Sequence, residues 1–205
     1  DRKKKFDSRV KFGGVDMYDR SIKKFDFPLL ILMHSKFILR GGFWDGKLLA
    51  CPYEGKIEQL LHFQVHSCTI TAIACTLSEK IIITGSKSGD LIIWNNQLSQ
   101  APNTNIEPHL SVQKTLCDHE GQVSSIFLNE EMNLMLTTSF DGTGNLYDLW
   151  NCKLLRTFKH HNLSPINQGI ISSCPLPAVC FYSREDHCWS SFSINGQSLQ
   201  HLVEQ

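Results

Sequence analysis

The feature that most constrains this chain is a repeat, in which one pattern of short apolar segments and tight turns recurs along most of its length. The turn glycines Gly46, Gly89 and Gly142 are 43 and 53 residues apart. The second and third copies stay in register beyond the turn, because His66 and His119 are also separated by 53 residues. No segment shows a sustained apolar period of 3.6 residues, so helices are not expected. The chain is therefore predicted to repeat one supersecondary unit.

The best-preserved copy runs from His119 to Asp148. Apolar residues alternate on both sides of a tight turn that contains Asp141 and Gly142. An Asp-Gly pair before alternating residues is a strong hairpin signal, because glycine tolerates the positive φ that such turns demand. This copy is predicted to fold as strand, turn, strand, tight turn, strand.

The repeat length predicts the fold class. Units of roughly 40–45 residues that each hold four short strands are typical of a β-propeller. One twisted blade cannot bury both of its faces alone, and packing blades face to face does so. We predict an all-β fold, a partial propeller of about four four-stranded antiparallel blades from a larger propeller. The predicted blades are 36–65, 66–118, 119–159 and 160–205. Residues 1–35 are predicted to be a polar segment and the remnant of a preceding blade. Residues 95–111 are predicted to be a loop insertion and an additional candidate for partner contact.

Composition excludes some classes of function. Twenty basic and twenty acidic residues balance, which gives no global reason to expect nucleic acid as a partner. The basic cluster in residues 1–26 is interpreted as a solvated tail or a connection between blades, and the alternative is a segment that binds an anionic membrane or nucleic acid. With no signal peptide and no initiator methionine, we expect an intracellular piece of a longer protein. The eight cysteines are then expected to be reduced thiols. A zinc site is not expected, because strand alternation would separate its candidate ligands: Cys174, Cys180, His187 and Cys188.

The units resemble WD repeats. In that family a His before the first strand, a Ser or Thr in the second, an Asp in the turn and a Trp in the third strand form a hydrogen-bonded network. Ser88 replaces the Asp in the second unit, so that network is expected to be weaker. The resemblance assigns these residues to the networks: His119, Ser139, Asp141 and Tyr147 in the third unit, His66, Ser86 and Trp94 in the second, and Asp45 in the first.

Two stretches resemble one lineage of WD-repeat proteins. The run from Gly41 to Gly46, GGFWDG, is similar to a run in the C-terminal propellers of BEACH-domain proteins of the neurobeachin type, and residues 176–196 are similar to their last blade. The resemblance implies a cytoplasmic scaffold in vesicle trafficking and membrane dynamics, with peripheral association to endomembranes or vesicles. It also implies a BEACH domain upstream in the same polypeptide. The alternative is a WD-repeat adaptor of another system, such as a ubiquitin-ligase substrate receptor or an RNA-processing complex.

The chemistry of single residues favours a structural role over catalysis. His119, Asp141 and Ser139 have the composition of a catalytic triad, but their spacing is that of a blade network and no nucleophile elbow is present. We therefore predict no enzyme and no cofactor or metal. The pair His160-His161 is predicted to lie in a solvent-facing loop.

Function is expected to come from surfaces that bind proteins or peptides, because propellers present loops on a rigid frame. Large or charged residues in the turns are candidate contacts. The alternative for the aromatic ones is that they pack between blades. The candidates are Phe43, Trp44, Lys87, Phe140 and Arg184.

Overall fold

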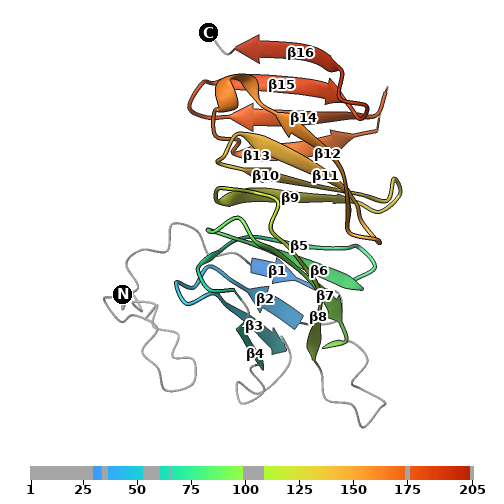
Figure 1. Cartoon of the computed structure of the whole chain (residues 1–205). Helices are drawn as coiled ribbons and strands as arrows, with labels where there is room; N and C mark the ends of the chain where they lie inside the picture. Colours follow the sequence, from blue (N-terminus) through green and yellow to red (C-terminus); the bar gives the residue numbers. More distant parts are fainter. Residues whose placement is uncertain are drawn as a thin grey trace, which may run out of the picture.

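The computed structural model shows an all-β chain of four antiparallel sheets stacked in chain order (Figure 1). It describes residues 30–33, 37–52, 61–64, 66–98, 109–173 and 176–203. Each sheet has four strands whose order in the sheet follows the sequence. The predicted fold class, a set of four-stranded propeller blades, is confirmed.

The strands keep the same order in every sheet. The sheets are β1 (Leu30–Leu32), β2 (Phe37–Arg40), β3 (Lys47–Pro52) and β4 (Leu61–Gln64); β5 (Ile70–Cys75), β6 (Ile81–Ser86), β7 (Leu91–Asn96) and β8 (Leu110–Leu116); β9 (Val123–Asn129), β10 (Leu134–Ser139), β11 (Thr143–Asp148) and β12 (Lys153–Lys159); and β13 (Gln168–Ser172), β14 (Ala178–Ser183), β15 (Cys188–Ser193) and β16 (Ser198–Val203). A short 3-10 turn, η4 (His161–Leu163), precedes the last sheet.

Two boundaries differ from the sequence prediction. Residues 30–32, assigned to the remnant of a preceding blade, are the first strand of the first sheet, because β1 pairs antiparallel with β2. The predicted insertion at 95–111 is shorter, because Asn95 pairs with Ser111 and Asn96 with Leu110. Residues 1–29, which include the basic cluster, lie outside the described residues.

Apolar side chains fill the space between successive sheets. The second strands of the two middle sheets are buried along their whole length, because both of their faces are covered. Successive strand residues point to opposite faces. Ile82 accordingly packs in the core toward the first sheet, whereas Ile81 and Ile83 pack in the core toward the third. A third core joins the last two sheets around Phe158 and Phe181.

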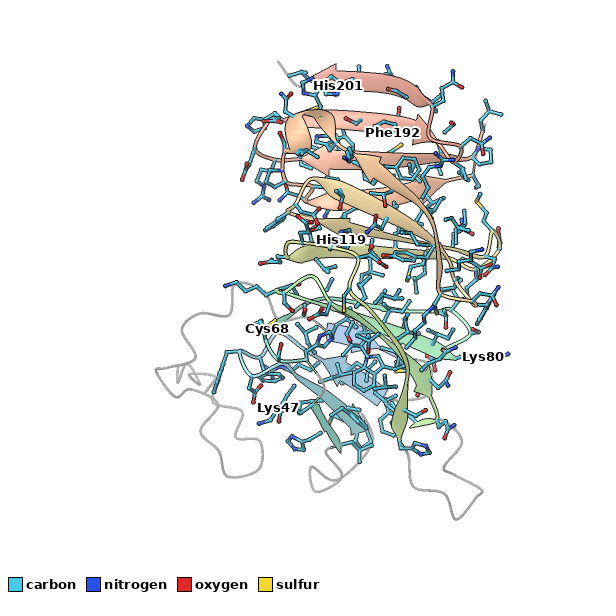
Figure 2. The ribbon with its side chains drawn as sticks, viewed as in Figure 1. Lys47, Cys68, Lys80, His119, Phe192 and His201 are labelled. Carbon is cyan, nitrogen blue, oxygen red and sulfur yellow. The ribbon has the colours of Figure 1, made fainter. Side chains whose placement is uncertain are left out.

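The stack has two opposite edges. The first strands β1, β5, β9 and β13 lie next to one another in that order. The loops that precede β5 and β9 lie on the same edge as the turns between second and third strands. The turns between first and second strands lie on the other edge. Figure 2 shows Cys68 and His119 on one edge and Lys80 on the opposite one.

Candidate functional site: polar networks and one edge of turns

A polar network ties the third sheet to the loop that precedes it. His119 is 5% exposed. Its Nε2 lies 2.8 Å from the Thr137 hydroxyl, and its Nδ1 lies 3.0 Å from the Thr143 hydroxyl. That hydroxyl donates to Asp141 at 2.6 Å, so its oxygen is available to accept the Nδ1 proton. The bonds therefore define one direction, from Thr137 through His119 and Thr143 to Asp141.

The electrostatics of this network follow from burial and hydrogen bonds. Burial lowers the pKa of His119 despite the opposing carboxylate of Asp141, 3.4 Å away, so the ring is neutral at pH 7. Burial alone would raise the pKa of Asp141. Hydrogen bonds from the hydroxyl and N–H of Thr143 and from the N–H of Glu120 outweigh it and lower that pKa. The network is thus a neutral imidazole joined to an ionised carboxylate.

Two residues assigned to this network bond to groups other than the ring of His119. Ser139 is not the hydroxyl that contacts His119; its oxygen accepts the N–H of Asp141 at 3.1 Å and shapes the turn. The Tyr147 hydroxyl donates to Asp118 at 3.1 Å. Burial and that carboxylate raise the pKa of Tyr147. Sequence reasoning missed Thr137, whose counterpart Thr84 lies 53 residues upstream in the repeat register.

The second sheet keeps part of the same network. His66 Nε2 lies 2.8 Å from the Thr84 hydroxyl, which also accepts the indole N–H of Trp94 at 2.9 Å. Ser86, the predicted hydroxyl, instead lies 2.9 Å from the hydroxyl of Ser88. Thr84 and Ser86 lie on the same face of one strand, so the pattern alone could not separate them.

In the second sheet the carboxylate stands two residues later in the turn than it does in the third sheet. Ser88 stands at the position of Asp141, and Asp90 at that of Thr143. The Ser88 hydroxyl donates to the Asp90 carboxylate at 2.6 Å. The hydroxyl and the carboxylate have therefore exchanged places relative to the turn of the third sheet. The buried Nδ1 of His66 has no hydrogen-bond partner. The link from imidazole to carboxylate is therefore missing here.

The first and last sheets differ more. Asp45 accepts the N–H of Lys47 and pairs with its ammonium at 2.6 Å, which confines it to its own turn. In the last sheet, strand register places Phe181 where the third sheet has Thr137, and Phe192 where it has Tyr147. Their ring centroids are 5.9 Å apart.

His160 is buried, which corrects the prediction of a solvent-facing loop. It is 2% exposed, and neither ring nitrogen has a hydrogen-bond partner. Burial lowers its pKa, and the neighbouring His201 lowers it further. His161, in contrast, is exposed and stacks on His201 with ring centroids 4.7 Å apart. The last sheet is thus preceded by a buried histidine, but that histidine takes part in no hydrogen-bond network.

The candidate contact residues gather on one edge, here called the turn edge, which is formed by the β2–β3, β6–β7, β10–β11 and β14–β15 turns. Trp44, Lys87 and Phe140 occupy the same turn position, two residues before a turn glycine. Trp44 is 82% exposed and Phe140 41% exposed, so neither is packed away between sheets. Arg184 is exposed in the fourth turn, and Phe43 is half-buried beneath the guanidinium of Arg40.

The described cysteines are free thiols. Strand pairing places Cys180 and Cys188 on opposite faces of the last sheet. Cys188 Sγ lies 3.1 Å from His201 Nδ1. Cys174, the remaining cysteine, lies outside the described residues. Across the described ranges, no group of three or more His, Cys, Asp or Glu side chains is arranged to hold a metal ion. Within the same ranges, no helix is long and apolar enough to span a bilayer.

The chain carries WD repeats, and its four-stranded sheets resemble the propeller blades of WD-repeat proteins. The family model for the WD domain, G-beta repeat, matches residues 57–95 and 110–148. The first match runs from β4 into β7 and the second from β8 through β11, so each covers the last strand of one sheet and most of the next sheet, including the strands of the histidine networks.

The more specific relatives are BEACH-domain proteins, as the GGFWDG run predicts. The chain is 20% identical to BEACH domain-containing protein B of Arabidopsis thaliana over 84% of the chain and 7% of that protein. It is 24% identical to the human Lysosomal-trafficking regulator over 71% of the chain and 4% of that protein. It is also 27% identical to mouse Cilia- and flagella-associated protein 52, over 69% of the chain and 19% of that protein. These similarities confirm the predicted resemblance to the WD-repeat region of BEACH proteins, and the chain spans a small part of each relative.

Proposed function

We propose that this chain is a non-catalytic protein-interaction module, the C-terminal propeller of a BEACH-type protein that acts in vesicle trafficking and membrane dynamics. The observation that carries the proposal is the turn edge. The repeat places a large or charged side chain at one turn position in successive sheets. Aromatic and arginine side chains on a rigid frame are frequent hot spots of protein interfaces.

The polar networks support a structural role over a catalytic one. Within them, Ser139 and Ser86 hydroxyls bond to turn groups and not to a histidine. The His119 nitrogens are engaged by hydroxyls of neighbouring strands. A general base must reach the proton that it removes, and this imidazole is nearly inaccessible. We assign the networks to holding the turn edge in place, in a cytoplasmic protein that associates peripherally with endomembranes or vesicles.

The test is quantitative affinity purification from cells that express the tagged chain. Trp44→Ala combined with Phe140→Ala is expected to deplete a defined set of bound proteins. The matched control is Leu176→Ser, which alters a leucine that is 71% exposed on the opposite edge. An unchanged set of partners in the double variant would contradict the proposal.

The second candidate is a WD-repeat adaptor of another complex, such as a ubiquitin-ligase receptor or an RNA-processing assembly. The similarity to Cilia- and flagella-associated protein 52 favours it, because that relative carries no BEACH name. Sequencing the transcript upstream of this chain separates the two. A BEACH domain encoded there supports the first proposal, and an F-box or other adaptor motif supports the second.

A further inference from the structure

A pocket of about 340 Å³ opens on the edge opposite the turn edge, where three first strands meet. Its walls are apolar side chains of β1, β5 and β9, among them Ile31, Cys75 and Leu128. Leu77 and Glu130 stand at its rim. Pockets of this size suit one bulky side chain or a small ligand.

The rim is built by contacts between two sheets. Glu130, in the loop after β9, accepts the N–H groups of Leu77 and Ser78 through Oε1, and the second of these bonds is 3.2 Å long. These bonds fix the loop after β5 against the loop after β9. They also hold Leu77 outward, where it is 86% exposed. A leucine kept in water beside an apolar pocket offers surface that a partner would bury.

The rim is acidic. Glu130 lines the pocket, and the two loops beside it also carry Glu79 and Glu131 together with one cation, Lys80. The field of these carboxylates reaches the pocket wall: burial raises the pKa of Cys75 to about 12, and Glu79 and Glu130 contribute. A cationic partner is favoured at such a rim, and an anionic one is repelled.

We propose that this pocket binds a basic peptide segment of a partner protein, with one bulky apolar side chain in the pocket and flanking Lys or Arg side chains at the carboxylate rim. The inference names a partner chemistry for the proposed interaction module and rests on that function only for its expectation of protein partners. The pocket and the turn edge lie on opposite edges, so variants of one leave the other intact.

The experiment is fluorescence anisotropy on the whole chain, with a labelled nine-residue peptide in which one leucine is flanked on each side by two lysines and the remaining positions are glycine. We expect saturable binding that weakens with added salt. Leucine-to-glycine replacement in the peptide should weaken it by about tenfold or more, because the apolar contact is lost. Leu77→Ser and Glu130→Gln in the protein should each weaken it by about tenfold.

Controls use an exposed leucine and a carboxylate away from the pocket, in Leu176→Ser and Glu185→Gln, which should bind as the unaltered chain does. If the glycine peptide bound as tightly as the leucine peptide, binding would depend on charge alone, and the proposal would be overturned. So would unchanged affinity in Leu77→Ser, whose exposed position leaves folding intact even where Glu130→Gln unsettles the loop. Loss of partners in turn-edge variants with no peptide binding at all would reject the pocket and leave the proposed function standing.

Discussion

The third and fourth sheets differ in how the histidine before their first strand is held. The third begins with His119, whose ring nitrogens are engaged by Thr137 and Thr143. The fourth begins with His160, which is equally buried but whose ring nitrogens have no hydrogen-bond partner. In place of a hydroxyl the fourth sheet has Phe181, in van der Waals reach of other aromatic rings. One blade is therefore fixed by directional hydrogen bonds and its neighbour by apolar packing, within the same backbone frame.

The difference teaches what the repeat requires. The backbone needs the turn and a close fit between sheets. At Gly144 a Cβ would lie 2.3 Å from Phe181, so the glycine admits the neighbouring ring. The polar network is one way to fill the space between loop and sheet, and an aromatic cluster is another.

The largest effect is expected from the aromatic cluster. Phe181→Ala removes a fully buried ring that contacts Phe158 and Phe192. It should lower the free energy of unfolding by about 3–5 kcal/mol, because the cavity cannot refill. Urea unfolding followed by hydrogen exchange measures it, with exchange rising first in the last sheet. Phe181→Leu is the matched control and should cost less; equal costs would show that the cluster is loosely packed.

A somewhat smaller effect is expected at Asp141. Asp141→Ala should cost about 2–4 kcal/mol, because it leaves the Thr143 hydroxyl and the N–H groups of Thr143 and Glu120 without their acceptor. Ser88→Ala, at the equivalent exposed position of the second sheet, should cost less than about 1 kcal/mol. Thermal and urea unfolding of the two variants compare them directly. Similar losses would mean that the carboxylate is not the anchor of the third sheet.

The pH dependence of stability is a smaller, graded effect. The pKa values of His66, His119 and His160 are lowered from 6.5 in the folded chain, chiefly by burial. The unfolded state therefore binds protons more readily below about pH 6.5. The stability that the neutral rings provide is complete above that pH and is lost as the pH falls toward their folded pKa values. Each histidine adds a slope of at most about 1.4 kcal/mol per pH unit.

Urea unfolding between pH 7.5 and about pH 5 checks this slope. His160→Leu should flatten it, because one of the three lowered pKa values is removed. The nearby titratable groups are His161, His201 and Asp186, and of these Asp186 opposes the shift. A profile that stays as steep in His160→Leu would show that this ring does not titrate as described.

The sequence predicted the sheets well, because turn glycines and alternating apolar residues are local signals. It was less reliable for the site. Thr137 and Ser139 both offer hydroxyls on one face, and only the cross-strand position of His119 decides between them. The contact of Tyr147 with Asp118 joins side chains 29 residues apart. The exchange of Ser88 and Asp90 changes which atom reaches the histidine without changing the composition of the turn.

In the fourth sheet the sequence failed to predict the burial of a histidine. The predicted fourth blade, 160–205, includes β13 to β16, yet nothing in its sequence indicated that His160 is buried without hydrogen-bond partners. Burial of that ring depends on η4 and on His201 of β16, which approach only in the folded chain.

The most direct test compares the two histidines by the same substitution. His119→Leu should lower the free energy of unfolding by about 2 kcal/mol or more, because it leaves the buried hydroxyl of Thr137 without the imidazole and breaks the link from the ring to Thr143. His160→Leu should be neutral or stabilising, because it removes two buried nitrogens that have no hydrogen bonds. Urea unfolding of both variants at pH 7.5 decides the matter. Equal losses, or a larger loss for His160→Leu, would contradict the account that hydrogen bonds hold the third blade and apolar packing holds the fourth.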